Sequence, residues 1–536
     1  MPEPFPRIPL DTHDSDANPA VRLYGRRFFA DQTTLELLIE FLLVATSPKR
    51  LGSGSRSFDS LLPSREMLQE RWEDELKYAP RARLNLKLFA FFGASKLDSR
   101  HETHRDHLRH LDEVLKARMR VSDDTPENVL KTLENLFLGF HGVGMQRTWC
   151  AQSFIPVCQD MVACESIWQQ TKARGVVDWS EALDYFSHRQ AIFLSRGGEL
   201  LYLQLCNALR RSRSEVETWL ADSGLSSMLT TSEKDPVWLC EQLQAALAAM
   251  LAETPSTVSQ LAEFIDRSVD EETSTQTDGE KNDRRWTSCG WCPQETWHES
   301  YLFAVELLRG CRANLDLMDR LDLLETLCAL HVMRCLVTQA SRYASPQGSL
   351  AWPPYRLAIS DPDGNNQTVK QVSRASVQAV SKTIFDGLRH PDIFDKTPAG
   401  NRDRLYKEAD RRYGHKLFKT LGKRIGMIVP RRGAGERFVL NGRILRLLVV
   451  SLCSGRRITY DTFREAARAH FGLVFDESGL GQANGWATGV QTESFGKATD
   501  DWLIKMLEEA GALRRLSDSC ALVENAAAVG EQEVLA

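Results

Sequence analysis

Residues 33–45 read TTLELLIEFLLVA, and this stretch gives the first indication of the fold. Its apolar side chains occupy almost the whole circumference of a helix, which is typical of a helix that is buried on all sides. Helical periodicity recurs up to residue 345, whereas period-2 alternation is scarce, so the sequence predicts a mainly α fold with under roughly 10% strand in this part. Further helices are expected near 66–78, 104–120, 126–139, 157–172, 180–192, 198–211, 214–222, 235–253, 256–265, 296–310 and 316–344.

The composition is that of an ordinary globular protein. The chain has 536 residues, of which 42% are hydrophobic and 26% charged. This length suggests three or four domains of about 100–200 residues each, and the composition excludes a collagen-like, wholly disordered or membrane-spanning chain. The net charge of −5 excludes a uniformly basic nucleic-acid coat. Twelve cysteines, mostly in apolar helical runs, are typical of free thiols in a reducing cytosol, so we expect a soluble cytoplasmic protein without a signal peptide.

The chain divides where its composition changes. Residues 270–285 contain no apolar side chain, so this segment cannot contribute to a core. Residues 346–368 contain the turn-forming residues Pro, Gly, Asp and Asn, which predicts loops and turns. The expected order is a disordered N-terminal segment (1–20), a helical domain (21–265), an acidic linker or exposed loop (266–286), a helical block (287–345), a loop-rich connection with a helix (346–400), a basic segment with a winged-helix-like domain (401–525) and a tail (526–536).

Two helix starts are marked by their first residues. Thr125 is a good N-cap residue, and Pro126 then occupies the first helical position. The run from Arg196 to Glu199 contains two glycines and predicts a helix N-terminus with a carboxylate in its first turn. A carboxylate in that place stabilises the helix dipole and needs no further function.

Positive charge is concentrated in residues 402–468. This segment has 18 Lys or Arg against six Asp or Glu, a net charge of +12, which leaves −17 for the rest of the chain. Apolar residues recur at positions 405, 409, 413, 417, 421 and 425, which predicts a basic amphipathic helix followed by a Gly-flanked arginine pair. Guanidinium and backbone N–H groups can bind phosphates there, but the same charges are typical of a solvated face that complements an acidic remainder. The predicted phosphate-contacting residues are Lys423, Arg424, Arg431, Arg432, Arg437, Arg456 and Arg457.

The last part of the chain resembles a winged helix in its element order. Helices are expected over 441–453, 462–471 and 499–510, and residues 511–523 are expected to form a strand, a turn and a second strand. The third helix carries Asp500, Asp501, Glu508 and Glu509 with only Lys505 as a base. It would therefore present net negative charge to phosphates. Such a module would bind DNA through basic edges upstream of this helix, or it would dock a protein.

Two groups of residues have metal-ligand chemistry. His101, His104, His107 and His110 fall within ten residues, but three-residue steps on an α-helix turn the side chains to different sides. Cys289 and Cys292 form a lone C-x₂-C pair, which a helix carrying Cys328, His331 and Cys335 would complete if the two segments met. An exposed polar helix and a buried core stripe explain these two groups without a metal, and neither a metal nor a cofactor is expected.

The functional expectation rests on an architectural likeness. The chain has no P-loop, dinucleotide fingerprint, H-E-x-x-H, kinase or G-x-S-x-G motif. A large helical body that ends in a winged helix is similar to accessory proteins of bacterial anti-phage defence systems. This resemblance implies a non-enzymatic subunit of a DNA-directed complex, with DNA or RNA backbone and proteins such as an ATPase or a nuclease as partners, and no membrane. A metal-dependent nuclease with an unrecognised active site and a protein–protein scaffold remain alternatives.

Overall fold

The computed structural model describes most of the chain, and within the described part the fold is mainly helical, as the periodicity predicts. The described residues are 2–7, 18–25, 28, 32–52, 57–70, 74–80, 83, 86, 89, 102–122, 124–138, 154–163, 167–168, 186–187, 197–252, 256–273, 286–344, 352–453, 455–490, 500–517 and 520–525.

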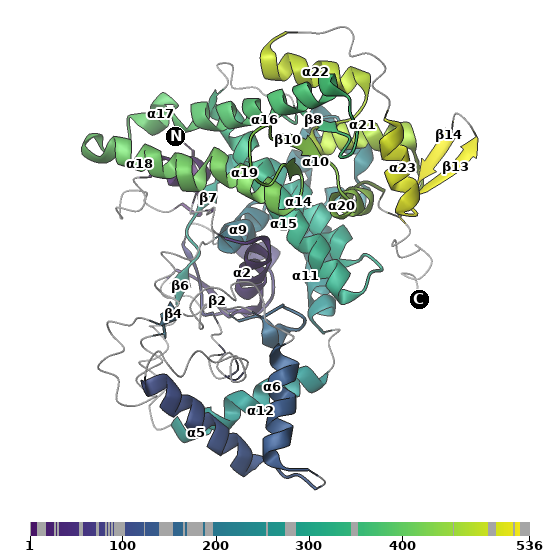
Figure 1. Ribbon diagram of the computed structural model, residues 1–536. Helices are drawn as coiled ribbons and strands as arrows, with labels where there is room; N and C mark the ends of the chain where they lie inside the picture. The colour runs from purple at the N-terminus through teal and green to yellow at the C-terminus, as the bar shows by residue number, and fades with distance from the viewer. Residues whose placement is uncertain are drawn as a thin grey trace.

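A group of long helices forms the centre of the protein (Figure 1). They are α2 (Thr34–Thr46), α9 (Gly197–Leu209), α14 (Trp297–Cys311) and α15 (Leu317–Ala344). α2 packs against α9 and α15, and α14 also packs against both. The side chains of Thr33 and Glu36 form a reciprocal capping box that begins α2. Most residues of this helix are buried, as its apolar circumference predicts.

The N-terminus of α9 lies directly against α2. The helix begins at Gly197, where the sequence predicts it. A Glu40 side-chain oxygen accepts a hydrogen bond from the Gly198 backbone N–H at 3.0 Å, and Gln32 accepts one from the Gly197 N–H at 3.2 Å. Side chains from the region of α2 therefore satisfy orphan N–H groups at the start of α9.

A second group of helices extends from the centre at the lower end of Figure 1. It contains α5 (Glu102–Arg118), α6 (Pro126–Leu138) and α12 (Ser256–Thr273), and α5 packs against both others. α6 starts at Pro126 as predicted, and the Thr125 hydroxyl accepts from the Asn128 N–H. Because α12 continues to Thr273, the acidic segment expected from residue 266 begins as a helix. Residues 274–285 lie outside the described part. The other body helices are α1 (Pro19–Tyr24), α3 (Arg65–Glu70), α10 (Arg213–Asp222) and α11 (Pro236–Ala252).

Short strands replace parts of three predicted helices. The helix expected near 66–78 ends early, and its last residues form β3 (Leu76–Tyr78), which pairs with β2 (Lys49–Leu51) and β6 (Thr287–Ser288). Leu76 and Tyr78 both point inward, so the local period is 2 rather than 3.6. The helices expected near 157–172 and 180–192 are also wrong where the chain is described, because β4 (Ile167–Trp168) and β5 (Phe186–Ser187) pair with each other.

The expectation of disorder over residues 1–20 is wrong at the first residues that the structure describes. β1 (Pro4–Phe5) pairs antiparallel with β7 (Cys292–Pro293). Phe5 is fully buried, and Arg210 lies over its ring at 4.6 Å. The burial of this aromatic side chain offsets the entropy cost of ordering the segment.

A four-stranded sheet lies in the second half of the chain. Its order is β12 (Leu473–Val474), β8 (Leu357–Ser360), β10 (Arg437–Val439) and β9 (Ile428–Val429), and β8 is parallel to both neighbours. Residues 346–368 were expected to form only loops and turns. This prediction is wrong at residues 357–360, which form β8. All four β8 residues are buried, so the strand has no polar alternation that would mark it in the sequence. α16 (Gln367–Leu388) packs against β8 and β10, and α17 (Pro391–Phe394) follows it.

The final elements of the chain, which we call the C-terminal unit, include a further three-stranded sheet. They are α20 (Gly442–Cys453), β11 (Ile458–Thr459), α21 (Tyr460–Phe471), α22 (Glu477–Thr488), α23 (Asp501–Glu509), β13 (Leu513–Ser517) and β14 (Cys520–Val523). The three strands pair antiparallel in the order β11-β14-β13. The sequence missed α22 in a Gly-rich stretch, where Asp476 caps the helix by accepting from the Gly479 N–H. α20 packs against α14 and α15, so this unit is continuous with the central core.

Candidate nucleic-acid interface

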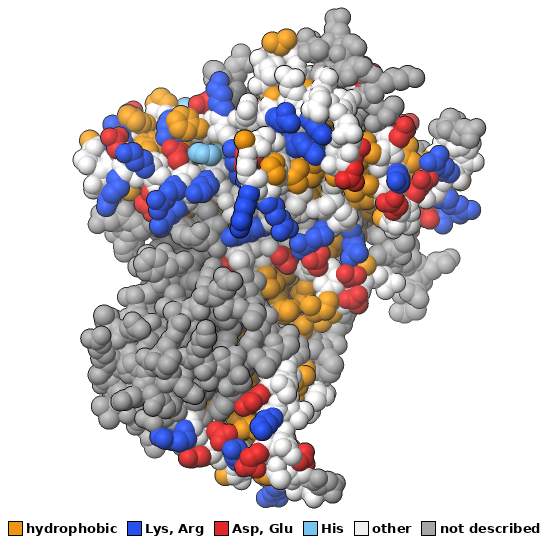
Figure 2. Space-filling view, in the orientation of Figure 1, with side chains coloured by type: hydrophobic (Ala, Val, Ile, Leu, Met, Phe, Trp, Pro, Cys, Tyr) orange, Lys and Arg blue, Asp and Glu red, His pale blue; other side chains and the backbone are white. Residues whose placement is uncertain are grey.

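The predicted basic amphipathic helix exists in three consecutive pieces. They are α18 (Arg402–Glu408), a π-helical turn (Ala409–Tyr413) and α19 (His415–Arg424). The apolar residues at positions 405, 409, 413, 417, 421 and 425 are all buried, as their spacing predicts. Figure 2 shows Lys and Arg side chains gathered over this region of the surface. The exposed ones are Arg404, Lys407, Arg411 and Lys416.

Lys423 is already paired within the protein. Its Nζ lies 2.5 Å from a Glu436 side-chain oxygen, and Lys419 contacts the other oxygen of that carboxylate at 2.9 Å. Partial burial would raise the pKa of Glu436, but the hydrogen bonds from Lys423 and Lys419 outweigh it and hold the pKa below its usual range. Part of the charge of Lys423 is therefore balanced locally.

Arg424 and Arg437 also serve internal contacts. Arg424 donates to the backbone carbonyl of Gln32, near the start of α2. Arg437 donates to the Ser360 hydroxyl at 2.6 Å and to the carbonyls of Asp361 and Pro362 at 3.2 and 3.0 Å. Partial burial lowers the pKa of Arg437, and the nearby Arg374 guanidinium adds to this effect. These two arginines connect the basic segment to the rest of the fold.

Arg431 and Arg432 occupy the tip of the hairpin between β9 and β10. Both are exposed, and among the residues that the structure describes no carboxylate is paired with either of them. Gly433 and Gly435 follow with φ angles of +97° and +85°, a backbone conformation that side chains with a Cβ rarely adopt. The two glycines turn the chain back into β10 and leave the arginine pair projecting. This hairpin tip can present two guanidinium groups to phosphates.

Arg456 and Arg457 lie at a different place, between α20 and β11. Arg456 is exposed, and Arg457 contacts Glu524 at 2.6 Å. α20 separates this pair from the hairpin, and its twelve residues span about 18 Å at 1.5 Å per residue. The seven predicted residues thus do not form one cluster. The structure places them as an arginine pair at the hairpin tip, a second pair beyond α20 and three residues held by internal contacts.

The outer face of α23 is acidic, as predicted. Asp501, Lys505, Glu508 and Glu509 are exposed on it. Lys505 lies 3.8 Å from Glu509, and Arg515 of β13 contacts Glu508 at 2.5 Å. The single lysine of this helix is therefore already opposed by a carboxylate.

The metal-ligand candidates do not form a metal site in the part of the chain that the structure describes. No group of three or more His, Cys, Asp or Glu side chains there has a suitable arrangement. Of the histidine cluster, only the side chain of His110 is described, and it is exposed. His331 is stacked on Phe303 with ring centroids 4.3 Å apart, and burial lowers its pKa well below the usual value. Cys335 contacts His331 at 3.3 Å and Gln204 at 3.7 Å, inside the core.

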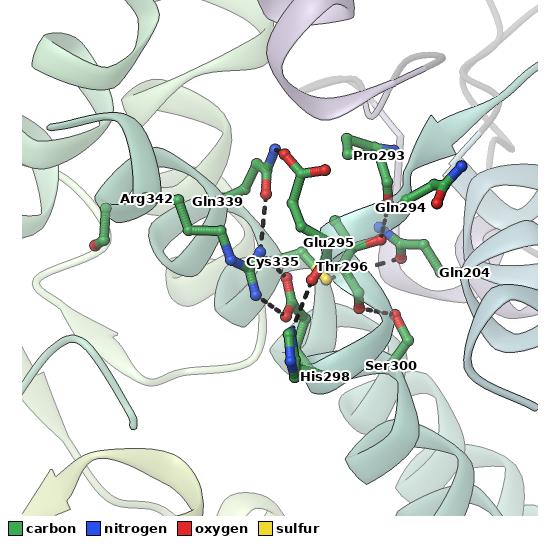
Figure 3. Close-up of polar contacts among 12 residues, drawn as sticks. Gln204, Pro293, Gln294, Glu295, Thr296, His298, Ser300, Cys335, Gln339 and Arg342 are labelled. Atoms are coloured by element: carbon green, nitrogen blue, oxygen red, sulfur yellow. Dashed lines mark hydrogen bonds and ion pairs between the residues drawn. The ribbon is translucent and has the colours of Figure 1, made fainter. Parts of the chain in front are cut away.

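A buried polar network joins α14 and α15, and sequence reasoning missed it. Figure 3 shows Gln339 of α15 directed toward Glu295, just before α14, and a dashed line joins Arg342 to Gln339. Gln339 donates to Glu295 at 3.0 Å, and Arg342 donates to both Glu299 oxygens at 2.8 and 2.6 Å. Charged residues within strongly apolar helical runs were the available signal, because a buried charge requires a partner.

The same network reaches the C-terminal unit. Glu306 of α14 accepts from both guanidinium nitrogens of Arg334 at 2.8 and 2.5 Å and contacts His470 of α21 at 2.5 Å. Burial alone would raise the pKa of Glu306, but Arg334 and His470 outweigh it and lower the pKa to about 2. All three residues are almost completely buried, so the network is structural rather than a site open to substrate.

The fold and this surface define a mainly helical protein with an exposed arginine pair on a hairpin tip and an acidic helix near its C-terminus. No family model, curated protein or solved structure matches the chain. Among the described residues, no helix combines the length and the apolar character that crossing a membrane requires.

Proposed function

We propose that this protein is a non-enzymatic accessory subunit of a bacterial DNA-directed complex, in the manner of anti-phage defence systems, and that it binds nucleic-acid backbone through its basic C-terminal region. The observation that carries the proposal is the hairpin tip, where Arg431 and Arg432 are exposed and have no carboxylate partner within the described part of the chain. Exposed guanidinium groups form charge-assisted, often bidentate hydrogen bonds to phosphates. The surrounding exposed Lys and Arg residues of α18 and α19 add attraction at longer range.

The C-terminal unit supports a winged-helix assignment. The order α20, β11, α21, α23, β13, β14 is that of a winged helix, and the first strand of the unit pairs with the last. β12 and α22 then form an insertion between the second and third helices. Because the outer face of α23 is acidic, we propose that this unit docks a protein partner through α23 and that the basic edges upstream contact nucleic acid.

The test is the salt dependence of DNA and RNA binding. Each phosphate neutralised contributes a slope of about −0.9 to log K against log salt for duplex DNA. We expect the double variant Arg431→Ala/Arg432→Ala to reduce the magnitude of this slope by up to about 2 and to weaken binding equally across sequences.

The matched control removes two positive charges elsewhere. Arg267 and Lys505 are exposed and lie beside Glu263 and Glu509, so Arg267→Ala/Lys505→Ala should leave the slope unchanged. If the wild-type protein retains neither DNA nor RNA at low salt, the proposal is wrong. The basic surface would then serve a protein contact, and the acidic face of α23 would favour a scaffold.

A further inference from the structure

Two phenylalanine rings are exposed on the surface formed by the end of α16, α17 and α18. Phe385 of α16 is 40% exposed and Phe394 of α17 is 37% exposed. Large aromatic side chains are usually buried, because removing their large apolar surface from water is favourable. The stretch 382–396 that carries both rings contains three Lys or Arg and three Asp, and the basic segment begins just after it at residue 402.

Each exposed ring has an arginine over its face. The Arg389 guanidinium lies 3.4 Å from the centroid of Phe385 and 4.9 Å from that of Tyr406. Tyr406 is 5.8 Å from Phe394, and Arg402 lies 4.1 Å from the Phe394 ring. These five residues form one continuous set of planar groups, which we call the aromatic–arginine row.

Hydrogen bonds to neighbouring residues fix three members of the row in position. Asp410 accepts from Arg389 at 2.7 and 3.2 Å, which fixes the plane of the guanidinium. Arg402 donates to the Thr397 carbonyl at 2.9 Å, and the Tyr406 hydroxyl donates to the Leu388 carbonyl at 3.0 Å. Because these side chains are already ordered, they lose little conformational entropy when a ligand stacks on them.

The surroundings of the row carry a small excess of positive charge. Residues 382–419 contain ten Lys or Arg against six Asp or Glu. The exposed basic side chains of this stretch are Lys382, Lys396, Arg404, Lys407, Arg411 and Lys416, and the exposed acidic ones are Asp386, Asp392, Asp395 and Asp403. Figure 2 shows hydrophobic and basic side chains lying side by side over α17 and α18. A partner for this surface must offer flat apolar faces together with negative charge.

We propose that the aromatic–arginine row binds single-stranded nucleic acid, with unpaired bases stacked on the exposed rings and phosphates against the basic side chains around them. Bases of single strands stack on aromatic side chains and on arginine planes, whereas the bases of a duplex already stack on each other. The row therefore favours a single strand over a duplex. This inference rests on the proposed nucleic-acid binding and names its substrate class.

The test compares the full-length protein with Phe385→Leu and Phe394→Leu variants. The probes are a short single-stranded oligothymidylate and a duplex of the same length, measured by fluorescence anisotropy. Leucine keeps the apolar contact but removes the flat ring. We expect each variant to bind the single strand about tenfold more weakly, because the base that stacks on the ring loses its contact. Duplex affinity and the salt slope should not change, because no phosphate contact is lost.

The control is Met318→Leu, which alters an exposed apolar side chain of α15 outside the row, and it should leave both affinities unchanged. If the protein binds duplex through Arg431 and Arg432 but the phenylalanine variants bind the single strand as tightly as wild type, this inference is wrong and the proposed function stands. If no nucleic acid binds at all, both are wrong. Thermal unfolding of each variant shows whether a loss of binding reflects a loss of fold.

Discussion

At the residue scale, the least expected feature is a completely buried lysine. The Lys49 Nζ donates to the carbonyls of Ala45, Ser47 and Val44 at 2.6, 2.7 and 3.1 Å. These carbonyls belong to the C-terminal end of α2, where the last turn of a helix lacks intrahelical donors. Lys49 therefore acts as a C-terminal cap whose positive charge also suits the helix dipole.

The burial of Lys49 predicts a dependence of stability on pH. Burial lowers the pKa of Lys49 from 10.5 to about 8. Between these two values the unfolded chain binds more protons at this residue than the folded protein does, so the contribution of Lys49 to the free energy of unfolding rises with pH. As the pH rises from below 8 to above 10.5, the free energy of unfolding of the wild type should increase by about 3 kcal/mol relative to that of Lys49→Met.

The measurement is denaturant unfolding of both proteins across that pH range. The comparison with Lys49→Met removes the effect of tyrosines and cysteines that titrate in both proteins. A constant difference between the two proteins would show that Lys49 keeps its ordinary pKa in the fold.

At the element scale, the close approach of α2 and α9 depends on a glycine. A Cβ at Gly198 would lie 2.3 Å from the Glu40 Cβ and 2.4 Å from the Phe41 backbone nitrogen, both in α2. Real side chains do not approach so closely, so the two helices would have to separate.

We expect Gly198→Ala to destabilise the protein by about 1–3 kcal/mol, the usual cost of overpacking a core. Gly400→Ala is the matched control, because no atom lies within 4 Å of a Cβ there. Thermal or denaturant unfolding gives both values. Equal stability of the two variants would mean that α2 and α9 can repack.

At the scale of the whole molecule, the C-terminal unit is part of the central core. α20 packs on α14 and α15, His470 of α21 contacts Glu306 of α14, and β12 completes the sheet of β8. Arg443 and Arg446 of α20 also contact Asp322 and Asp319 of α15.

We therefore expect a fragment of residues 440–525 not to fold alone. The buried face of α20 would be exposed, and Glu306 and β8 would be absent. Circular dichroism and thermal unfolding of the fragment, compared with the full chain, provide the measurement. A cooperative transition in the fragment would show that the unit is an independent domain.

The sequence by itself determined the mainly helical class, because the 3.6-residue spacing of apolar side chains is a local property. It also located the ends of helices whose caps are local, such as the start of α6 at Pro126, and the buried face of α18 and α19. Within the candidate site, it identified Arg431 and Arg432 as exposed candidates on a glycine-bearing turn.

Only the tertiary structure decided which charges face outward and which are paired. Lys423 pairs with Glu436 on the other side of the hairpin. Arg424 and Arg437 have the same side-chain chemistry as the arginines of the hairpin tip, but their partners come from distant segments, residue 32 and residues 360–362. The short strands β1, β4, β5 and β8 depend in the same way on partners far along the chain. The aromatic–arginine row also forms only when α16, α17 and α18 meet. Such contacts join residues that are far apart in the chain, so the local periodicity of the sequence does not predict them.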